Sequence, residues 1–187
     1  MTFRVEFFAD QAFLSMIKRM LKNAESYNKD QKIDFELEET ATAIVICHSA
    51  CEAFLNLFTR NIETIDFYKY EKKSIIDKIN ILYGELGETA DWTKLPLQDI
   101  RRIDKARNWL THFKDSNIGL TNSWGSWVVD EVNKKPKIDD SEELKYVRVK
   151  RYYDNSRMSL YRITELYQLH QNYEYLKTED YTSFLVG

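Results

Sequence analysis

A cation, an amide and an imidazole lie within a six-residue segment near the middle of the chain, at Arg107, Asn108 and His112. An imidazole transfers protons well near neutral pH, because its unperturbed pKa is about 6.5. A guanidinium can contact two oxygens of one phosphate and stabilise the charge that develops there. Cleavage of a phosphodiester bond without a metal ion needs these two groups. RNA would suit such a site, since its 2′-OH supplies the nucleophile.

The sequence around these three residues is basic. Four cations lie close to them: Arg101, Arg102, Lys105 and Lys114. The whole chain has a net charge of −3, from 27 basic and 30 acidic residues, so the positive charge is local and indicates no general nucleic-acid-binding surface. We expect Lys105 and Lys114 to hold the flanking phosphates of a substrate.

The apolar spacing predicts that the segment lies on a helix from about Pro96 to Lys114. Its apolar side comprises Ile103, Ala106, Leu110 and Phe113, and its polar side comprises Asp104, Asn108, Thr111, His112 and Asp115. Asn108 could orient the ring of His112, which is one turn away. Arg107 lies about 140° from His112 on an ideal helix. Either the long arginine side chain swings round, or two copies of the helix meet at a two-fold interface. The alternative to a catalytic site is that this polar side of the helix only faces solvent.

The whole sequence predicts one all-α domain over residues 1–187, a bundle of four to five helices. The chain is 43% hydrophobic and 30% charged, as in soluble globular proteins, and its 5 Gly and 2 Pro are few for a turn-rich β fold. Further helices are expected at about 10–27, 34–60, 71–86 and 154–177. Residues 2–8 alternate as a short strand would. Two apolar runs, Trp127–Val129 and Tyr146–Val149, also allow a small β-hairpin near 127–152.

The predicted second helix is apolar on several sides and is expected at the centre of the bundle. Cys47 and Cys51 lie one turn apart on it, which is poor disulfide geometry, so we expect two buried, reduced cysteines. The sequence has no run of about 18 apolar residues and no signal-peptide pattern. These features predict a cytoplasmic protein with no membrane contact.

A polar stripe, His48, Glu52 and Asn56, follows the same helix at intervals of four residues. One histidine and one glutamate are too few ligands for a zinc site, so we expect no metal and no cofactor. The favoured interpretation is a buried His48–Glu52 pair. The other is that the stripe, and Glu52 and Asn56 in particular, supports the catalytic residues from behind. The third histidine, His170, is interpreted as a packing residue or a surface residue without a catalytic role.

The chain resembles the HEPN family (higher eukaryotes and prokaryotes nucleotide-binding domains) over about residues 35–120. Arg107-Asn108 followed after three residues by His112 is similar to the hallmark motif of that family. The segment Ala50–Asn56 resembles an early core helix of bacterial HEPN-like proteins, and Leu95–Leu97 leads into the motif helix in a similar way. Residues 121–152 have no counterpart in this resemblance.

The resemblance implies a helical bundle that dimerises through the motif helix. It also implies a metal-independent endoribonuclease, often a toxin of a toxin–antitoxin pair or a phage-defence effector, with RNA as substrate and an antitoxin or regulatory protein as a further partner. In that reading Arg107, Asn108 and His112 are catalytic. Family members that lack the motif only bind nucleotides or partners, and a catalytically inactive nucleotide-binding or protein-interaction module is therefore the alternative.

Overall fold

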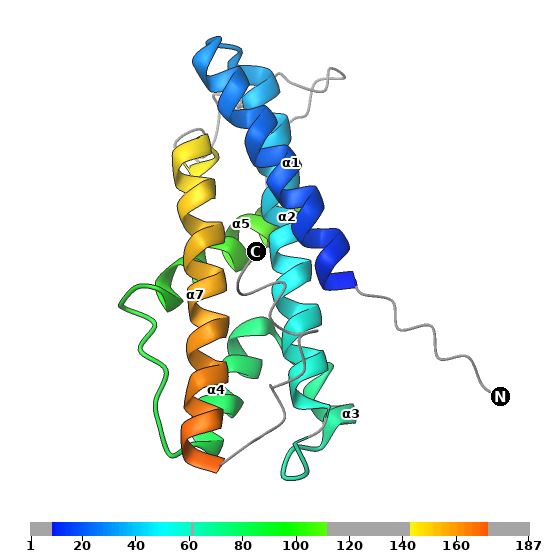
Figure 1. Ribbon diagram of the computed structural model, residues 1–187, viewed down its shortest axis with the longest axis vertical. Helices are drawn as coiled ribbons and strands as arrows, with labels where there is room; N and C mark the ends of the chain where they lie inside the picture. Colours follow the sequence, from blue (N-terminus) through cyan, green and yellow to red (C-terminus); the bar gives the residue numbers. More distant parts are fainter. Residues whose placement is uncertain (1–8, 61, 112–142, 172–187) are drawn as a thin grey trace, which may run out of the picture.

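A computed structural model of the chain describes residues 9–60, 62–111 and 143–171. Over these ranges it contains helices and no strand, which confirms the predicted all-α bundle (Figure 1). The helices are α1 (Ala9–Lys29), α2 (Ile33–Thr59), α3 (Phe67–Tyr70), α4 (Ile75–Glu85), α5 (Leu97–Thr111) and α7 (Tyr146–Gln171).

Helix α2 is the centre of the bundle. Figure 1 shows α1 returning antiparallel along α2, with α7 beside them, and α5 packs against both α2 and α7. The predicted apolar stripe of α2 is buried, and consists of Ile44, Cys47, Cys51, Phe54, Leu55 and Phe58. The two cysteines are unpaired, as expected. A hydrogen bond with Cys47, together with burial, raises the pKa of the Cys51 thiol well above its ordinary value, which keeps it protonated.

By length and hydropathy, α2 is also a candidate membrane span. An 18-residue window in it has a mean hydropathy of 1.5, and half of that window is buried inside the bundle. That window contains at most two charged residues, and polar residues such as Thr42 and Ser49 interrupt its apolar run. The core helix of a soluble protein has the same properties, and the packing of α1, α4, α5 and α7 around α2 gives its apolar surface a partner.

The helix predicted at about 71–86 corresponds to α4, which begins at Ile75, and the short helix α3 precedes it across a turn at residues 71–74. The reason is local. Ser74 accepts a hydrogen bond from the backbone N–H of Asp77 at 3.1 Å, and its hydroxyl donates to the Asp77 carboxylate at 2.8 Å. Such a reciprocal cap fixes a helix start. Helix α4 ends as predicted, just before Gly87, whose φ of +69° suits a glycine.

Helix α7 begins at Tyr146, about eight residues before its predicted start near Asp154. The described half of the expected hairpin, Tyr146–Val149, is therefore helical and that prediction was wrong. The buried carboxylate of Glu36 accepts from the backbone N–H of Tyr146 at 2.8 Å, which satisfies a first-turn donor that a helix leaves without a partner. The other half, Trp127–Val129, and the strand expected at 2–8 lie outside the described residues, as does the predicted end of the last helix.

Candidate functional site

Helix α5 carries the described part of the motif at its C-terminal end. It spans Leu97–Thr111, against a prediction of about Pro96–Lys114. Its buried side includes Leu97, Ile100, Ile103 and Ala106. Of these, Ile103 and Ala106 were predicted to be buried from the apolar pattern. Arg107 is half-buried, and Asn108 and Thr111 are exposed. His112 and Lys114 lie outside the described residues.

Arg107 and Asn108 form a hydrogen-bonded pair. Arg107 Nη1 donates to Asn108 Oδ1 at 2.9 Å, and Asn108 Nδ2 lies 3.4 Å from Asp104 Oδ2, one turn back on the same helix. The amide therefore has its oxygen towards the guanidinium and its nitrogen towards the carboxylate. This orientation presents the two polar side chains together at the end of α5.

Asp104 also reaches across to the core helix. His48 Nε2 of α2 lies 3.1 Å from Asp104 Oδ1, with the imidazole only 7% exposed and the carboxylate 17% exposed. An ionised carboxylate can only accept hydrogen bonds, so Nε2 carries the proton in this pair. The predicted His48–Glu52 pair was wrong, because α5 packs against α2 at this height and its own carboxylate faces the ring.

Glu52 pairs with α4 instead. Its Oε1 lies 2.8 Å from Nζ of Lys78, whose side chain is fully buried while Glu52 is 36% exposed. A buried ammonium requires a counter-charge, which explains why Glu52 faces α4. This ion pair directs Glu52 towards α4, so it does not connect Glu52 to the motif as predicted. For Asn56, the side-chain oxygen is buried and has no hydrogen-bond partner among the described residues.

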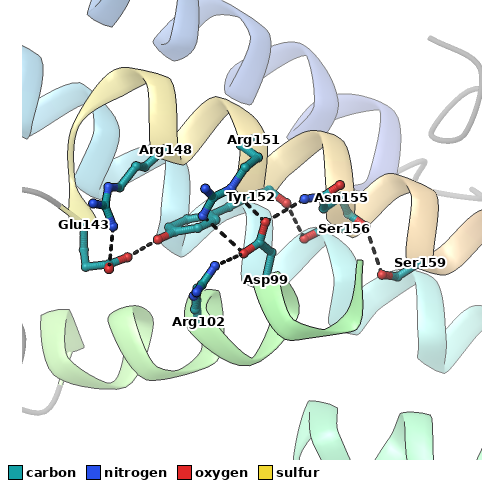
Figure 2. Close-up of polar contacts among 9 residues, drawn as sticks. All are labelled: Asp99, Arg102, Glu143, Arg148, Arg151, Tyr152, Asn155, Ser156 and Ser159. Carbon is teal, nitrogen blue, oxygen red and sulfur yellow. Dashed lines mark hydrogen bonds and ion pairs between the residues drawn. The ribbon is translucent and has the colours of Figure 1, made fainter. Parts of the chain in front are cut away.

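A second polar cluster fixes α5 against α7, and sequence reasoning missed it. Figure 2 shows Asp99 of α5 at its centre, fully buried, with Arg102, Arg151 and Asn155 around it. Asp99 Oδ1 lies 2.7 Å from Arg102 Nη1, and Asp99 Oδ2 lies 3.1 Å from Arg151 Nε and 2.6 Å from Asn155 Nδ2. Two cations and an amide thereby satisfy one buried carboxylate.

The cluster in Figure 2 continues along the first turns of α7. The hydroxyl of Tyr152 donates to Glu143, which also forms an ion pair with Arg148 at 3.0 Å. Glu143, which precedes α7, is thereby bound to two side chains within the first two turns of that helix. Among the cations expected near the motif, Arg102 forms an ion pair with Asp99, whereas Arg101 and Lys105 are exposed.

Two helices therefore contact α5 through its carboxylates: α7 at Asp99 in the first turn, and α2 at Asp104, which lies beside Asn108. Among the described residues, no group of three or more His, Cys, Asp or Glu side chains could hold a metal ion. Comparisons with protein-family models, with curated proteins and with solved structures find no match.

Proposed function

We propose that the protein is a metal-independent endoribonuclease whose catalytic residues are Arg107, Asn108 and His112. The observation that carries the proposal is the hydrogen-bonded pair of Arg107 and Asn108 at the end of α5, next to the sequence position of His112. The resemblance to the HEPN family, which rests on the same residues and on the segment Ala50–Asn56, supports it.

In the proposed reaction the 2′-OH of a ribose attacks the adjacent phosphorus, and the bond from phosphorus to the 5′-oxygen breaks. The products are a 2′,3′-cyclic phosphate and a 5′-hydroxyl. His112 takes the proton from the 2′-OH or gives one to the leaving 5′-oxygen. Arg107 stabilises the negative charge on the non-bridging phosphate oxygens. Asn108 orients His112 or binds phosphate, and Lys105 and Lys114 hold neighbouring phosphates.

The proposal includes a two-fold dimer through α5, in the cytoplasm, with an antitoxin or regulatory protein as a further partner. On the polar face of α5, Asp104 contacts His48 of the same protomer, whereas Asn108 and Thr111 are exposed and could face a second protomer. On an ideal helix Arg107 and His112 diverge by about 140°, so a second copy of the helix could complete the site. Each active centre would then contain residues of both protomers.

We expect Arg107→Lys to lower the rate of RNA cleavage by about 10²-fold, because an ammonium cannot reproduce the planar two-point contact to phosphate oxygens. The measurement is the cleavage rate of a labelled single-stranded RNA. The matched control is Arg101→Lys, an exposed arginine on another side of the same helix, which should cleave like the parent. Equal rates for parent and Arg107→Lys would remove Arg107 from the proposed mechanism.

The alternative function, a module that binds nucleotides or proteins without cleavage, is favoured by one observation. Arg102 forms an ion pair with the buried Asp99 within the protein, which leaves fewer cations near the motif to bind the phosphates of a long RNA. The same assay separates the two functions. A parent protein that retains labelled RNA or nucleotide on a filter while leaving it intact, across several RNA sequences, would favour the binding module.

A further inference from the structure

We infer that His48 and Asp104 are positioning residues for Arg107 and Asn108, an inference that rests on the proposed function. The four side chains form one chain of contacts from the core of the bundle to the end of α5. It runs from His48 to Asp104 at 3.1 Å, from Asp104 to Asn108 at 3.4 Å, and from Asn108 to Arg107 at 2.9 Å.

The direction of each hydrogen bond follows from the donor or acceptor character of the groups. The Asp104 carboxylate accepts on one oxygen from His48 and on the other from the Asn108 amide nitrogen. The Asn108 oxygen is then left to face Arg107, and it accepts from the guanidinium. If Asp104 were a donor on that side, the amide would turn over, and Arg107 would face an NH₂ group that cannot accept.

The buried end of this series of contacts, at His48, gives it a fixed starting point. Exposed polar side chains choose among several rotamers, whereas the His48 ring is held in the core with 7% of its surface exposed. Asp104 is fixed to that ring, so the orientation of Asn108 is set from a rigid helix and not by solvent. A misplacement of about 1 Å in a reacting group can cost about 10²-fold in rate, so such positioning has a measurable value.

A purely structural role is the competing explanation, in which the His48–Asp104 pair only joins α2 to α5. Two substitutions of His48 distinguish the roles. His48→Gln keeps an N–H donor that can reach Asp104, whereas His48→Leu fills the space without a donor. Asp104→Asn reverses the hydrogen bond towards Asn108 while keeping the shape. Asp99→Asn is the matched control, because it makes the same chemical change on the same helix but at the contact with α7.

The experiment measures kcat and KM for RNA cleavage, at a temperature at which circular dichroism shows each variant folded. We expect His48→Leu and Asp104→Asn to lower kcat by about 10-fold or more with KM changed less than about 3-fold, the sign of a group that acts on the transition state. His48→Gln and Asp99→Asn should keep kcat within about 3-fold of the parent. Equal losses for His48→Leu and His48→Gln, or for Asp99→Asn and Asp104→Asn, would overturn the inference.

A second readout needs no activity and separates this inference from the proposed function. The side-chain amide signals of Asn108 in a ¹⁵N–¹H NMR spectrum should shift in His48→Leu, because that variant loses the contact that fixes Asp104, and should stay in place in His48→Gln and Asp99→Asn. Unshifted signals in His48→Leu would overturn the positioning role. A parent that cuts no RNA, with the expected pattern of NMR shifts, would reject the ribonuclease and leave the positioning of Arg107 and Asn108 supported.

Discussion

Replacing His112 by alanine is expected to lower the rate of RNA cleavage by about 10²–10⁴-fold, the range for losing a general acid or base. The fold should persist, because His112 follows the last described residue of α5 and the core contacts of that helix come from residues before it, such as Ile100 and Ile103. The measurement is a time course with labelled single-stranded RNA, alongside a thermal melt of each protein.

The control for this variant is His170→Ala, the same substitution at a histidine outside the motif. It should leave the cleavage rate unchanged. If His112→Ala cleaved as fast as the parent, the proton transfer would have to be assigned to another group and the proposed site would be wrong. If both alanine variants lost activity equally, the effect would come from stability and not from chemistry.

Replacing Phe54 by alanine is expected to destabilise the protein by about 3–5 kcal/mol, the range for truncating a buried aromatic side chain. Phe54 is 2% exposed on the central helix, and its ring is parallel to that of Phe58 at a centroid distance of 6.0 Å. Because α2 contacts α1, α4, α5 and α7, a cavity there weakens several helix contacts at once. Urea unfolding followed by circular dichroism measures the loss.

The matched control on the same helix is Leu57→Ala. Leu57 is 41% exposed, and exposed substitutions change stability by about 0.5 kcal/mol or less. A similar loss of stability for the two variants, or a melting temperature of Phe54→Ala within a degree or two of the parent, would contradict the central position of α2 in the bundle.

The helices with a continuous apolar stripe could be predicted from the sequence, because burial of one face imposes the 3.6-residue period. This holds for α2, whose ends were predicted to within a few residues, and for the described parts of α1 and α5. The prediction failed at Tyr146–Val149, where a short β-branched run resembles a strand. Its helical state depends on Glu36, which is more than a hundred residues away in the sequence, and no local pattern contains that contact.

The motif residues could be found from their types and spacing, but their partners could not. His48 was identified as polar within an apolar helix, yet its pairing with Asp104 depends on how α2 and α5 pack. A usable signal existed for two of the missed residues. Asp99 is aligned with Ile103 on the predicted buried stripe of α5, and Lys78 lies one turn from both Ile75 and Leu82, which are apolar and buried on α4. A charge on a buried stripe indicates a partner on a neighbouring helix.

The ends of the RNA fragments test the central claim most directly. A labelled single-stranded RNA and the matching DNA are incubated with the parent protein in EDTA, and the product ends are mapped. A metal-independent site that uses the 2′-OH predicts 2′,3′-cyclic phosphate and 5′-hydroxyl ends on the RNA, an unchanged rate in EDTA, and intact DNA. Cleavage that stops in EDTA, or fragments with 3′-hydroxyl and 5′-phosphate ends, would contradict the account.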